Sequence, residues 1–383
     1  MTFWTEKSYL PKKCMVGKGS RLNIFDELKE LVEINSYTFN KEGVNKNGDI
    51  YKDKMSKIGF VYDEYKREHI GNHLLFKSQK KEGKKVLLVG HLDTVFPEGS
   101  FEGYKEDSKW VYGPGVCDMK GGNLVAIESL RRIYKEKGSV SNIDLFLVSD
   151  EEKGSLDSSK ITEKLSKEYS YALVFEAAGK NMEIVTSRKG SGAFEIEIKG
   201  KAAHAGNDYM LGVDANLEAS YKLQELVKLT DLGKGTTVNV GKIEGGRGAN
   251  TISPYAKLTF EIRYTSKDER DRVLNEIKRI VQTSFVEGSS AVLSGGIERD
   301  VMEESESQKD FVKLLEKIIG KKLPTEKRGG VSDANIIASQ GVPVLDGFGP
   351  FGDGDHTLKE RALKSSFFER IDLTCKVLEE LTS

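Results

Sequence analysis

The residues that could do chemistry in this chain lie at the ends of short apolar segments. His91 and Asp93 directly follow the apolar run VLLVG at 86–90. The imidazole of His91 is a nitrogen ligand that suits Zn²⁺, and Asp93 can accept the other ring N–H and so fix the orientation of the ring. The alternative is a capped turn with an ordinary histidine, because a His-x-Asp spacing is common. This segment indicates a metal site only in combination with others.

Asp118 lies in a glycine-rich loop, YGPGVCDMKGGN, directly before a helical pattern. Glycine lets a backbone approach a ligand closely, and one carboxylate can bridge two cations with its two oxygens. The alternative makes Asp118 a helix N-cap and Lys120 a solvated charge. Cys117 is assigned to packing rather than to metal binding.

Three successive acids, Asp150, Glu151 and Glu152, follow the apolar run IDLFLVS at 143–149. On an exposed helix start such acids would simply suit the helix dipole, but at a buried strand end their repulsion requires cations nearby. Neighbouring carboxylates can also divide two tasks. One binds a metal ion, and the next takes a proton from water whose pKa the metal lowers to about 7.

Two further candidates follow later apolar runs. Glu176 lies at the end of YALVFEA, and His356 lies in the polar loop FGPFGDGDHT after the last apolar run. Taken singly, each is better explained as a core acid or a surface histidine. Five candidates at the strand ends of one sheet together predict a metal site. The five are His91, Asp118, Glu152, Glu176 and His356.

The segments that position these residues alternate between strand and helix patterns. The runs at 86–90, 143–149 and 171–177 are nearly continuous in apolar residues, as strands buried on both faces are. Segments 26–34 and 121–137 have helical apolar spacing. This alternation predicts an α/β domain with a largely parallel sheet, whose ligands bind beyond the carboxyl ends of the strands.

A different pattern begins near residue 188, where GAFEIEIKGK alternates apolar and polar residues. The elements expected there are a strand at 193–199, a helix at 213–229, strands at 236–243 and 256–265, a helix at 267–283 and a strand at 291–295. This βαββαβ order is that of a ferredoxin-like α+β unit.

After Gly296 the α/β pattern resumes. The expected elements are a helix at 308–319, a helix from 333, a strand at 342–349 and a closing helix from 365. We therefore predict a catalytic α/β domain built from residues 1–187 and 298–383, interrupted by an inserted α+β domain at 188–297.

Composition narrows the class of protein. The 383 residues contain 59 Lys and Arg against 60 Asp and Glu, so the net charge of −1 argues against nucleic acid or an anionic membrane as a partner. Cys14, Cys117 and Cys375 are odd in number and far apart, which excludes a disulfide framework and favours a reducing compartment. No apolar stretch resembles a signal sequence or a membrane span, so a cytoplasmic protein is expected.

Taken in order, these segments resemble the zinc-dependent aminoacylase and carboxypeptidase family, most closely its bacterial glutamate carboxypeptidases of the folate-hydrolysing type. The resemblance covers nearly the whole chain. The matching segments are GHLDTV, GPGVCDMKGGN, SDEEKGS, FEA, GKAAHAG, GANTISP, EIRY, GGVSDA and the late His356.

The resemblance implies a division of the ligands between two zinc ions, with Co²⁺ or Mn²⁺ as alternatives. His91 and Glu176 would hold one ion, Glu152 and His356 the other, and Asp118 would bridge them. Members of the family also dimerise through the inserted domain, so a homodimer is expected here.

The resemblance further implies that Glu151 is the general base and that Asp93 orients His91. It also implies a cis peptide bond after Asp118. His204 would reach the active site of the partner subunit and donate to the oxyanion. Without the resemblance, a histidine in a tight Gly/Ala loop would be the simpler reading of His204.

Several positions match substrate-binding residues of the family: Asn250, Arg263, Gly329, Gly330 and Ser332. Arg263 has the planar donor set that pairs with a carboxylate, although a solvated strand charge is the alternative. Ser332 stands where many relatives have Thr. The segment EAAGKNM lacks the proline turn of close glutamate carboxypeptidases, which bears on substrate preference more than on chemistry.

Glu rather than Asp at position 176 is associated in this family with carboxypeptidases and deacylases. The resemblance therefore implies hydrolysis of an amide bond in a small peptide, with release of a C-terminal amino acid such as glutamate. The alternatives are an N-acyl amino acid deacylase and, after it, a dipeptidase. A metal-binding or dimerisation module without turnover is the alternative from another class, and the intact Glu151–Glu152 pair argues against it.

Overall fold

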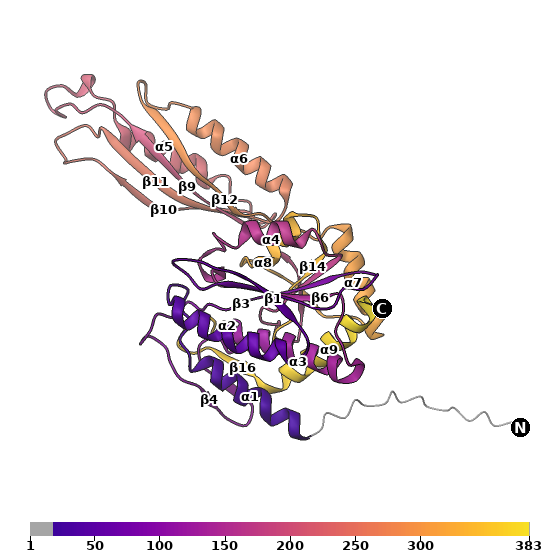
Figure 1. The fold of residues 1–383 in the computed structure, drawn as a ribbon. Helices are drawn as coiled ribbons and strands as arrows, with labels where there is room; N and C mark the ends of the chain where they lie inside the picture. The colour runs from indigo at the N-terminus through magenta and orange to yellow at the C-terminus, as the bar shows by residue number, and fades with distance from the viewer. Residues whose placement is uncertain (1–17, 383) are drawn as a thin grey trace, which may run out of the picture.

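The computed structural model describes residues 18–382, with side chains from Ile24 onward. These residues form a broad α/β body from which a long α+β unit projects (Figure 1). Cys14 and the N-terminal segment on which the absence of a signal sequence was predicted lie outside the described residues. Within residues 18–382, no helix combines the length and the hydropathy that crossing a membrane needs.

The body is built on a six-stranded sheet in the order β1-β2-β6-β3-β7-β14. The strands are β1 (Val61–Tyr65), β2 (His73–Lys77), β3 (Val86–His91), β6 (Ile143–Val148), β7 (Tyr171–Val174) and β14 (Val344–Leu345). The last four run parallel, and β1 and β2 are antiparallel additions at one edge. The largely parallel sheet is thus confirmed. The edge strand β1 was not predicted because it is mostly exposed and lacks a continuous apolar run.

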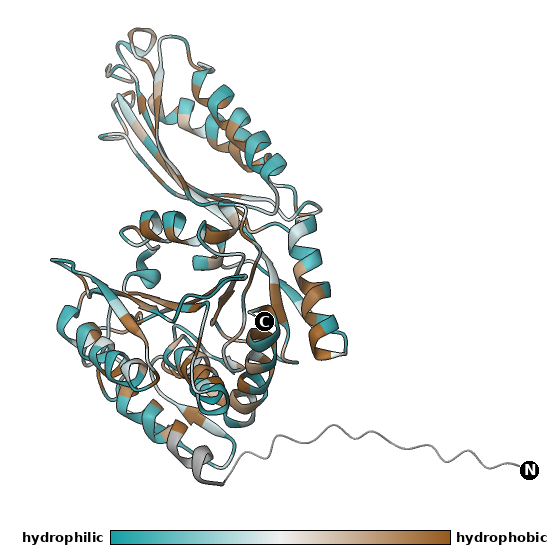
Figure 2. Ribbon diagram, turned by 45° about the vertical axis from the view of Figure 1, so that its right-hand side comes forward, coloured by the Kyte–Doolittle hydropathy of each residue, from teal (hydrophilic) through white to brown (hydrophobic). Residues whose placement is uncertain are grey.

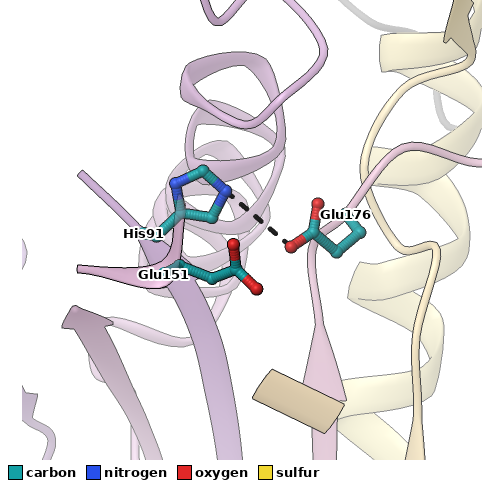
Figure 3. A group of neighbouring side chains, drawn as sticks. All are labelled: His91, Glu151 and Glu176. Atoms are coloured by element: carbon teal, nitrogen blue, oxygen red, sulfur yellow. Dashed lines mark ion pairs between the residues drawn. The ribbon is translucent and has the colours of Figure 1, made fainter. Parts of the chain in front are cut away.

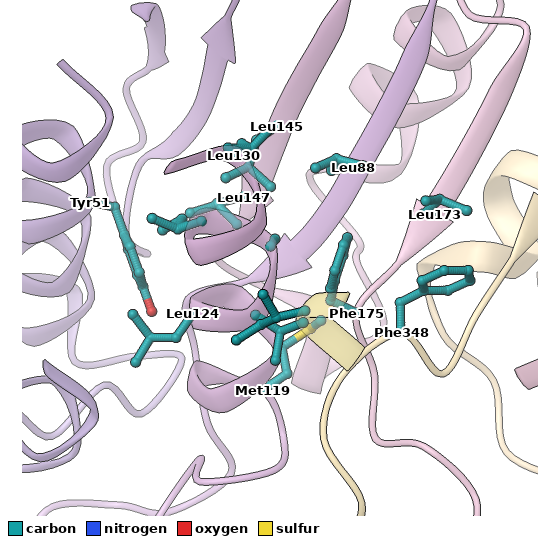
Figure 4. Packing of buried hydrophobic residues seen from close by; sticks show 14 of the residues in the cluster. Tyr51, Leu88, Met119, Leu124, Leu130, Leu145, Leu147, Leu173, Phe175 and Phe348 are labelled. Carbon is teal, nitrogen blue, oxygen red and sulfur yellow. The ribbon is translucent and has the colours of Figure 1, made fainter. Parts of the chain in front are cut away.

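Helices cover both faces of this sheet, because its central strands are apolar on both sides. On one face lie α1 (Lys18–Val32), α2 (Lys41–Ser56), α3 (Lys120–Lys137), α7 (Glu306–Ile319) and α9 (Lys364–Leu381). On the other lie α4 (Ser159–Ser166) and α8 (Asp333–Ser339). Figure 4 shows the first face, where Leu88, Leu145 and Leu147 meet Leu124 and Leu130 of α3. This packing buries the strands whose ends position the candidate residues.

The projecting unit has the predicted βαββαβ order. Its elements are β9 (Gly190–Lys199), α5 (Ala215–Val227), β10 (Thr237–Gly245), β11 (Tyr255–Tyr264), α6 (Lys267–Gln282) and β12 (Ser290–Arg299). The strands form an antiparallel sheet in the order β10-β11-β9-β12, with both helices packed on one face. Figure 2 shows that these helices are amphipathic, with both colours along each. The predicted fold class, an α/β domain with an inserted ferredoxin-like domain, is confirmed.

The two chain crossings between body and insert lie side by side. Strand β8 (Ile184–Arg188) leads into the insert, and β12 leads out of it. The backbone N–H of Arg188 donates to Met302 at 3.0 Å, and that of Met302 donates to Arg188 at 3.1 Å. The bounds 188–297 of the inserted domain stay a prediction, and β12, the last strand of its sheet, continues two residues further to Arg299.

Candidate metal centre

His91 is the last residue of β3 and is buried, with 1% of its surface exposed. Its Nδ1 lies 3.0 Å from the backbone oxygen of Asp93 and 3.5 Å from Oδ1 of the same residue. Asp93 is itself held, because its Oδ2 accepts from the Thr38 hydroxyl at 2.7 Å. The ring therefore turns its Nε2 toward the acids of the site, which supports the proposed orienting role of Asp93.

Asp118 lies between two histidines. Its Oδ1 is 3.0 Å from Nε2 of His91, and its Oδ2 is 3.1 Å from Nε2 of His356. The two oxygens of one carboxylate thus face different imidazoles, which is the arrangement a bridging ligand needs. The peptide bond between Asp118 and Met119 is cis, as the resemblance implied.

The loop before Asp118 is fixed by a buried acid that the sequence did not single out. Glu360, 1% exposed, accepts the backbone N–H groups of Gly115, Cys117 and Asp118 at 3.0, 3.0 and 3.2 Å. Burial, with a contribution from the charge of Asp118, raises the pKa of Glu360 to about 7. No local pattern marked this role, because the contact spans more than 240 residues of chain.

Each histidine also faces a glutamate. Glu176 Oε1 lies 3.8 Å from His91 Nε2, and Glu152 Oε2 lies 3.1 Å from His356 Nε2. Figure 3 shows His91, Glu151 and Glu176 turned toward one another. Among the described residues, the ligand atoms of this trio lie within 4.8 Å of one another, and so do those of His91, Asp118 and Glu152. All five predicted metal ligands therefore meet at one edge of the sheet.

The charges at this edge are unbalanced. Burial, and next the charge of Asp118, raises the pKa of Glu152 to about 8 and that of Glu176 well above its usual range. Hydrogen bonds to Asp118 and Glu152 raise the pKa of His356 to about 11. Against the effect of burial, hydrogen bonds with His356 and His91 hold the pKa of Asp118 well below its ordinary value. Divalent cations would stabilise all the carboxylates in their ionised form, so the donor set fits such ions.

Glu151, the proposed base, comes just after β6 and begins the short 3-10 helix η1 (Glu151–Lys153). Its backbone N–H donates to Asp93 Oδ1 at 3.3 Å, which connects it to the support of His91. Its Oε1 accepts from the guanidinium of Arg299 at 2.6 Å. Arg299 ends β12 of the insert, and nothing in its sequence surroundings pointed to this contact.

A cavity of 410 Å³ opens over these residues. Its lining comprises Asp118, Glu151, Glu176, Ala177, Ala178, Arg188, Arg328, Gly329, Gly330, Val331, Gly352, Asp355 and His356. Two of the predicted substrate-binding residues, Gly329 and Gly330, are among them. Ser332 is not, because it is buried as the N-cap of α8 and its hydroxyl donates to Asp346 Oδ2 at 2.6 Å.

The other predicted binding residues lie in the insert and do not line this cavity. His204 and Asn250 share one exposed region, where the backbone N–H of Ala205 donates to the backbone oxygen of Asn250 at 3.0 Å. Arg263 donates to Glu261 of its own strand at 2.6 and 3.2 Å. Within the described chain, the two crossings between body and insert place Arg188 in the cavity lining and Arg299 beside Glu151, while His204, Asn250 and Arg263 lie elsewhere.

Comparison with known proteins agrees with this architecture. A model described as peptidase dimerisation domain, of the M20 family, matches residues 186–289, and one described as peptidase family M28 matches residues 74–223. Carboxypeptidase G2 of Pseudomonas sp. (strain RS-16) is 29% identical over 363 residues, covering 91% of this chain and 86% of that relative. Succinyl-diaminopimelate desuccinylase of Buchnera aphidicola subsp. Acyrthosiphon pisum (strain APS) is 26% identical, covering 85% and 90%.

Solved structures share the fold along nearly the whole chain. The aminopeptidase PepT of Bacillus cereus superposes with a TM-score of 0.79 at 21% identity, covering 94% of this chain and 98% of that one. The M20 family metallo-carboxypeptidase Sso-CP2 of Sulfolobus solfataricus gives 0.70 at 15% identity, covering 93% and 98%. The dimerisation model falls on the inserted βαββαβ unit, and the relatives span body and insert together. The chain is therefore similar to metallopeptidases of the M20 type, through the match of its insert to the peptidase dimerisation domain and through its fold, and this similarity supports a metal-dependent peptidase.

Proposed function

We propose that this chain is a two-zinc amide hydrolase that releases a C-terminal amino acid from a small peptide. The observation that supports it most is the position of Asp118, whose two oxygens face His91 and His356 at 3.0 and 3.1 Å. The similarity to a carboxypeptidase over 91% of the chain favours release of a C-terminal residue.

The ligands divide into two sets around the bridging carboxylate. His91 and Glu176 form one set, and Glu152 and His356 form the other, as their separations of 3.8 and 3.1 Å suggest. Each set thus has one imidazole and one glutamate, with the Asp118 carboxylate shared between them. Such ligands suit zinc, and Co²⁺ or Mn²⁺ are the alternatives.

Zinc ions bound there would polarise the amide carbonyl and lower the pKa of the attacking water. Glu151 takes the proton of that water and returns it to the leaving amine, because its carboxylate lies beside the ligands and lines the cavity. Asp93 keeps the His91 ring in place. Gly329 and Gly330 line the cavity, and their backbone N–H groups would bind the terminal carboxylate of a peptide.

The proposal includes a homodimer formed through the inserted domain. His204 and Asn250 are exposed at the surface of the insert and do not line the metal cavity of their own chain. The same loop exposes Tyr209, Met210 and Leu211 by 59%, 89% and 62%. An apolar loop beside a hydrogen-bond donor fits burial against a second copy, where His204 would donate to the oxyanion and Asn250 and Arg263 would contact substrate.

A second candidate function is deacylation of an N-acyl amino acid. Several relatives are succinyl-diaminopimelate desuccinylases at 23 to 26% identity, which favours this candidate. Dipeptide hydrolysis comes third. The cytoplasmic location expected from the cysteines stays a prediction.

One screen tests these activities. The purified protein is loaded with zinc and given a panel of N-acyl and peptidyl amino acids that vary in the acyl group and the C-terminal residue. The proposal expects turnover that depends on the C-terminal residue, is lost with a chelator and returns with Zn²⁺. Dependence on the acyl group alone would favour a deacylase. Bound metal without turnover on any amide would contradict the proposal and favour the non-catalytic module.

A further inference from the structure

Arg299 reaches the metal centre from the end of the last strand of the projecting sheet. It is the last residue of β12 and is 4% exposed. Its NH1 donates to Glu151 Oε1 at 2.6 Å, and its NH2 donates to the backbone oxygen of Glu151 at 3.2 Å. The guanidinium therefore holds both the side chain and the main chain of one glutamate.

Arg299 is held in turn from the opposite side. Its NH2 also donates to the Ser155 hydroxyl at 2.7 Å, and that hydroxyl donates to Asp333 Oδ1 at 2.6 Å. Asp333 Oδ1 lies 3.9 Å from the guanidinium. Asp333 begins α8, directly after the loop that lines the cavity. Arg299 thus joins the loop after β6, the end of β12 and the start of α8 in one buried network.

Glu151 has a second environment within reach. Its carboxylate lies within 4.8 Å of the ligand atoms of both His91 and Glu176, close enough to ligate an ion there. A carboxylate that ligates a cation is a weaker base, because the positive charge stabilises its ionised form. Glu152, next in sequence, contacts His356 instead of Arg299. Glu151 and Glu152 therefore differ in their contacts, because only Glu151 accepts a hydrogen bond from the guanidinium of Arg299.

We propose that Arg299 is a positioning residue that holds Glu151 back from the metal ions, so that Glu151 remains a base while Glu152 becomes a ligand. This inference rests on the proposed function for the role of Glu151, and on the hydrogen bonds above for the role of Arg299. The planar guanidinium suits this role because its two terminal nitrogens bind the carboxylate and the backbone oxygen of the same glutamate, which fixes direction as well as distance.

The test compares Arg299→Met and Arg299→Lys with wild type. In Arg299→Met, kcat should fall on the order of 10²-fold, because a displaced catalytic group costs about that much, while KM stays within about twofold. Arg299→Lys keeps the positive charge but lacks the planar pair of donors, so it should recover part of kcat. Zinc content should remain that of wild type in both variants.

The visible absorption of bound Co²⁺ gives a test that does not depend on turnover. In Co²⁺-loaded Arg299→Met, Glu151 should join the ligands, so the visible absorption should change toward that of a higher coordination number. Adding Glu151→Gln to Arg299→Met should reverse that change. A crystal structure of Arg299→Met should show the Glu151 carboxylate turned toward His91 and Glu176.

Arg270→Met is the matched control. Arg270 pairs with Asp300, the residue next to Arg299, at 2.5 Å but does not line the cavity. It should change neither kcat nor the Co²⁺ spectrum, although both variants remove a buried or half-buried ion pair at the same strand end.

Three results would overturn the proposal: a rise in KM with kcat unchanged, a Co²⁺ spectrum identical to wild type, or equal effects of Arg270→Met and Arg299→Met. If wild type hydrolyses no amide, the proposed function fails, while the spectrum and the crystal structure still decide the role of Arg299.

Discussion

At the scale of single residues, adjacent carboxylates differ through their contacts. Glu151 accepts from Arg299, whereas Glu152 lies 3.1 Å from His356. We expect Glu151→Gln to lower turnover on the order of 10³-fold, because the amide cannot accept the proton of water. Zinc content, measured by elemental analysis, should stay at the wild-type level. Unchanged turnover would remove Glu151 from the role of base.

The same residues predict how metal-free protein responds to pH. Glu152 has a pKa of about 8 in the folded chain against an ordinary 4.5, so the native state binds more protons than the unfolded state between these values. Its stabilising contribution is present below pH 4.5 and is lost as pH rises through about 8. His356, raised to about 11 from 6.5, acts in the same direction at higher pH. Melting temperature without metal should therefore fall from pH 5 to pH 8.

Zinc should reverse this trend, since its ligands bind in their deprotonated forms. The rise in melting temperature on adding Zn²⁺ should thus be larger at pH 8 than at pH 5. Glu152→Gln should flatten the metal-free profile, because the amide does not titrate. An equal effect of zinc at both pH values would contradict the assignment of these ligands.

At the scale of elements, the loop of Asp118 depends on one acid from the far end of the chain. Glu360 accepts three backbone N–H groups of that loop. Glu360→Ala leaves these buried donors unpaired, at about 1–3 kcal/mol each, so the free energy of unfolding should fall measurably in urea. Zinc affinity should fall about 10- to 100-fold, as for other residues that orient ligands. Affinity equal to wild type would show that the loop holds its shape without Glu360.

A second element-scale prediction concerns the N-cap of α8. Ser332 caps this helix and donates to Asp346, so Ser332→Ala should cost about 1 kcal/mol of stability. Because the side chain does not line the cavity, KM should change little. A large rise in KM with normal stability would instead support direct contact between Ser332 and substrate.

At the scale of the whole molecule, the proposed dimer predicts complementation. Glu151→Gln lacks the base, and His204→Ala lacks the donor offered to the partner. If His204 acts across the interface, mixed dimers contain one site with both groups intact. Mixing the two inactive proteins should then restore activity, measured after exchange of subunits. Mixing Glu151→Gln with Glu152→Gln should restore none, since both defects lie in the same domain. Failure of the first mixture after verified subunit exchange would show that His204 does not act across the interface.

Much of the architecture followed from periodicity in the sequence. Continuous apolar runs predicted β3, β6 and β7, and alternation with period two predicted β9 and β11, because burial on one or both faces of a sheet selects these patterns directly. Strand ends then placed His91, Glu151, Glu152 and Glu176 near one edge. The strand expected at 342–349 is limited to Val344–Leu345 in the structure. The exposed strand β1 was missed because it contains no full apolar run.

By itself, therefore, the sequence determined the fold class and brought out the five candidate ligands, and the family resemblance added Glu151 as the proposed base. Only the tertiary structure decided which groups hold those residues in place. Arg299 and Glu360 are distant in sequence from the residues they fix, by 148 positions for Glu151 and 242 for Asp118. Burial of a charge requires a partner but leaves no periodic signal, so such pairs become visible only when the chain is folded.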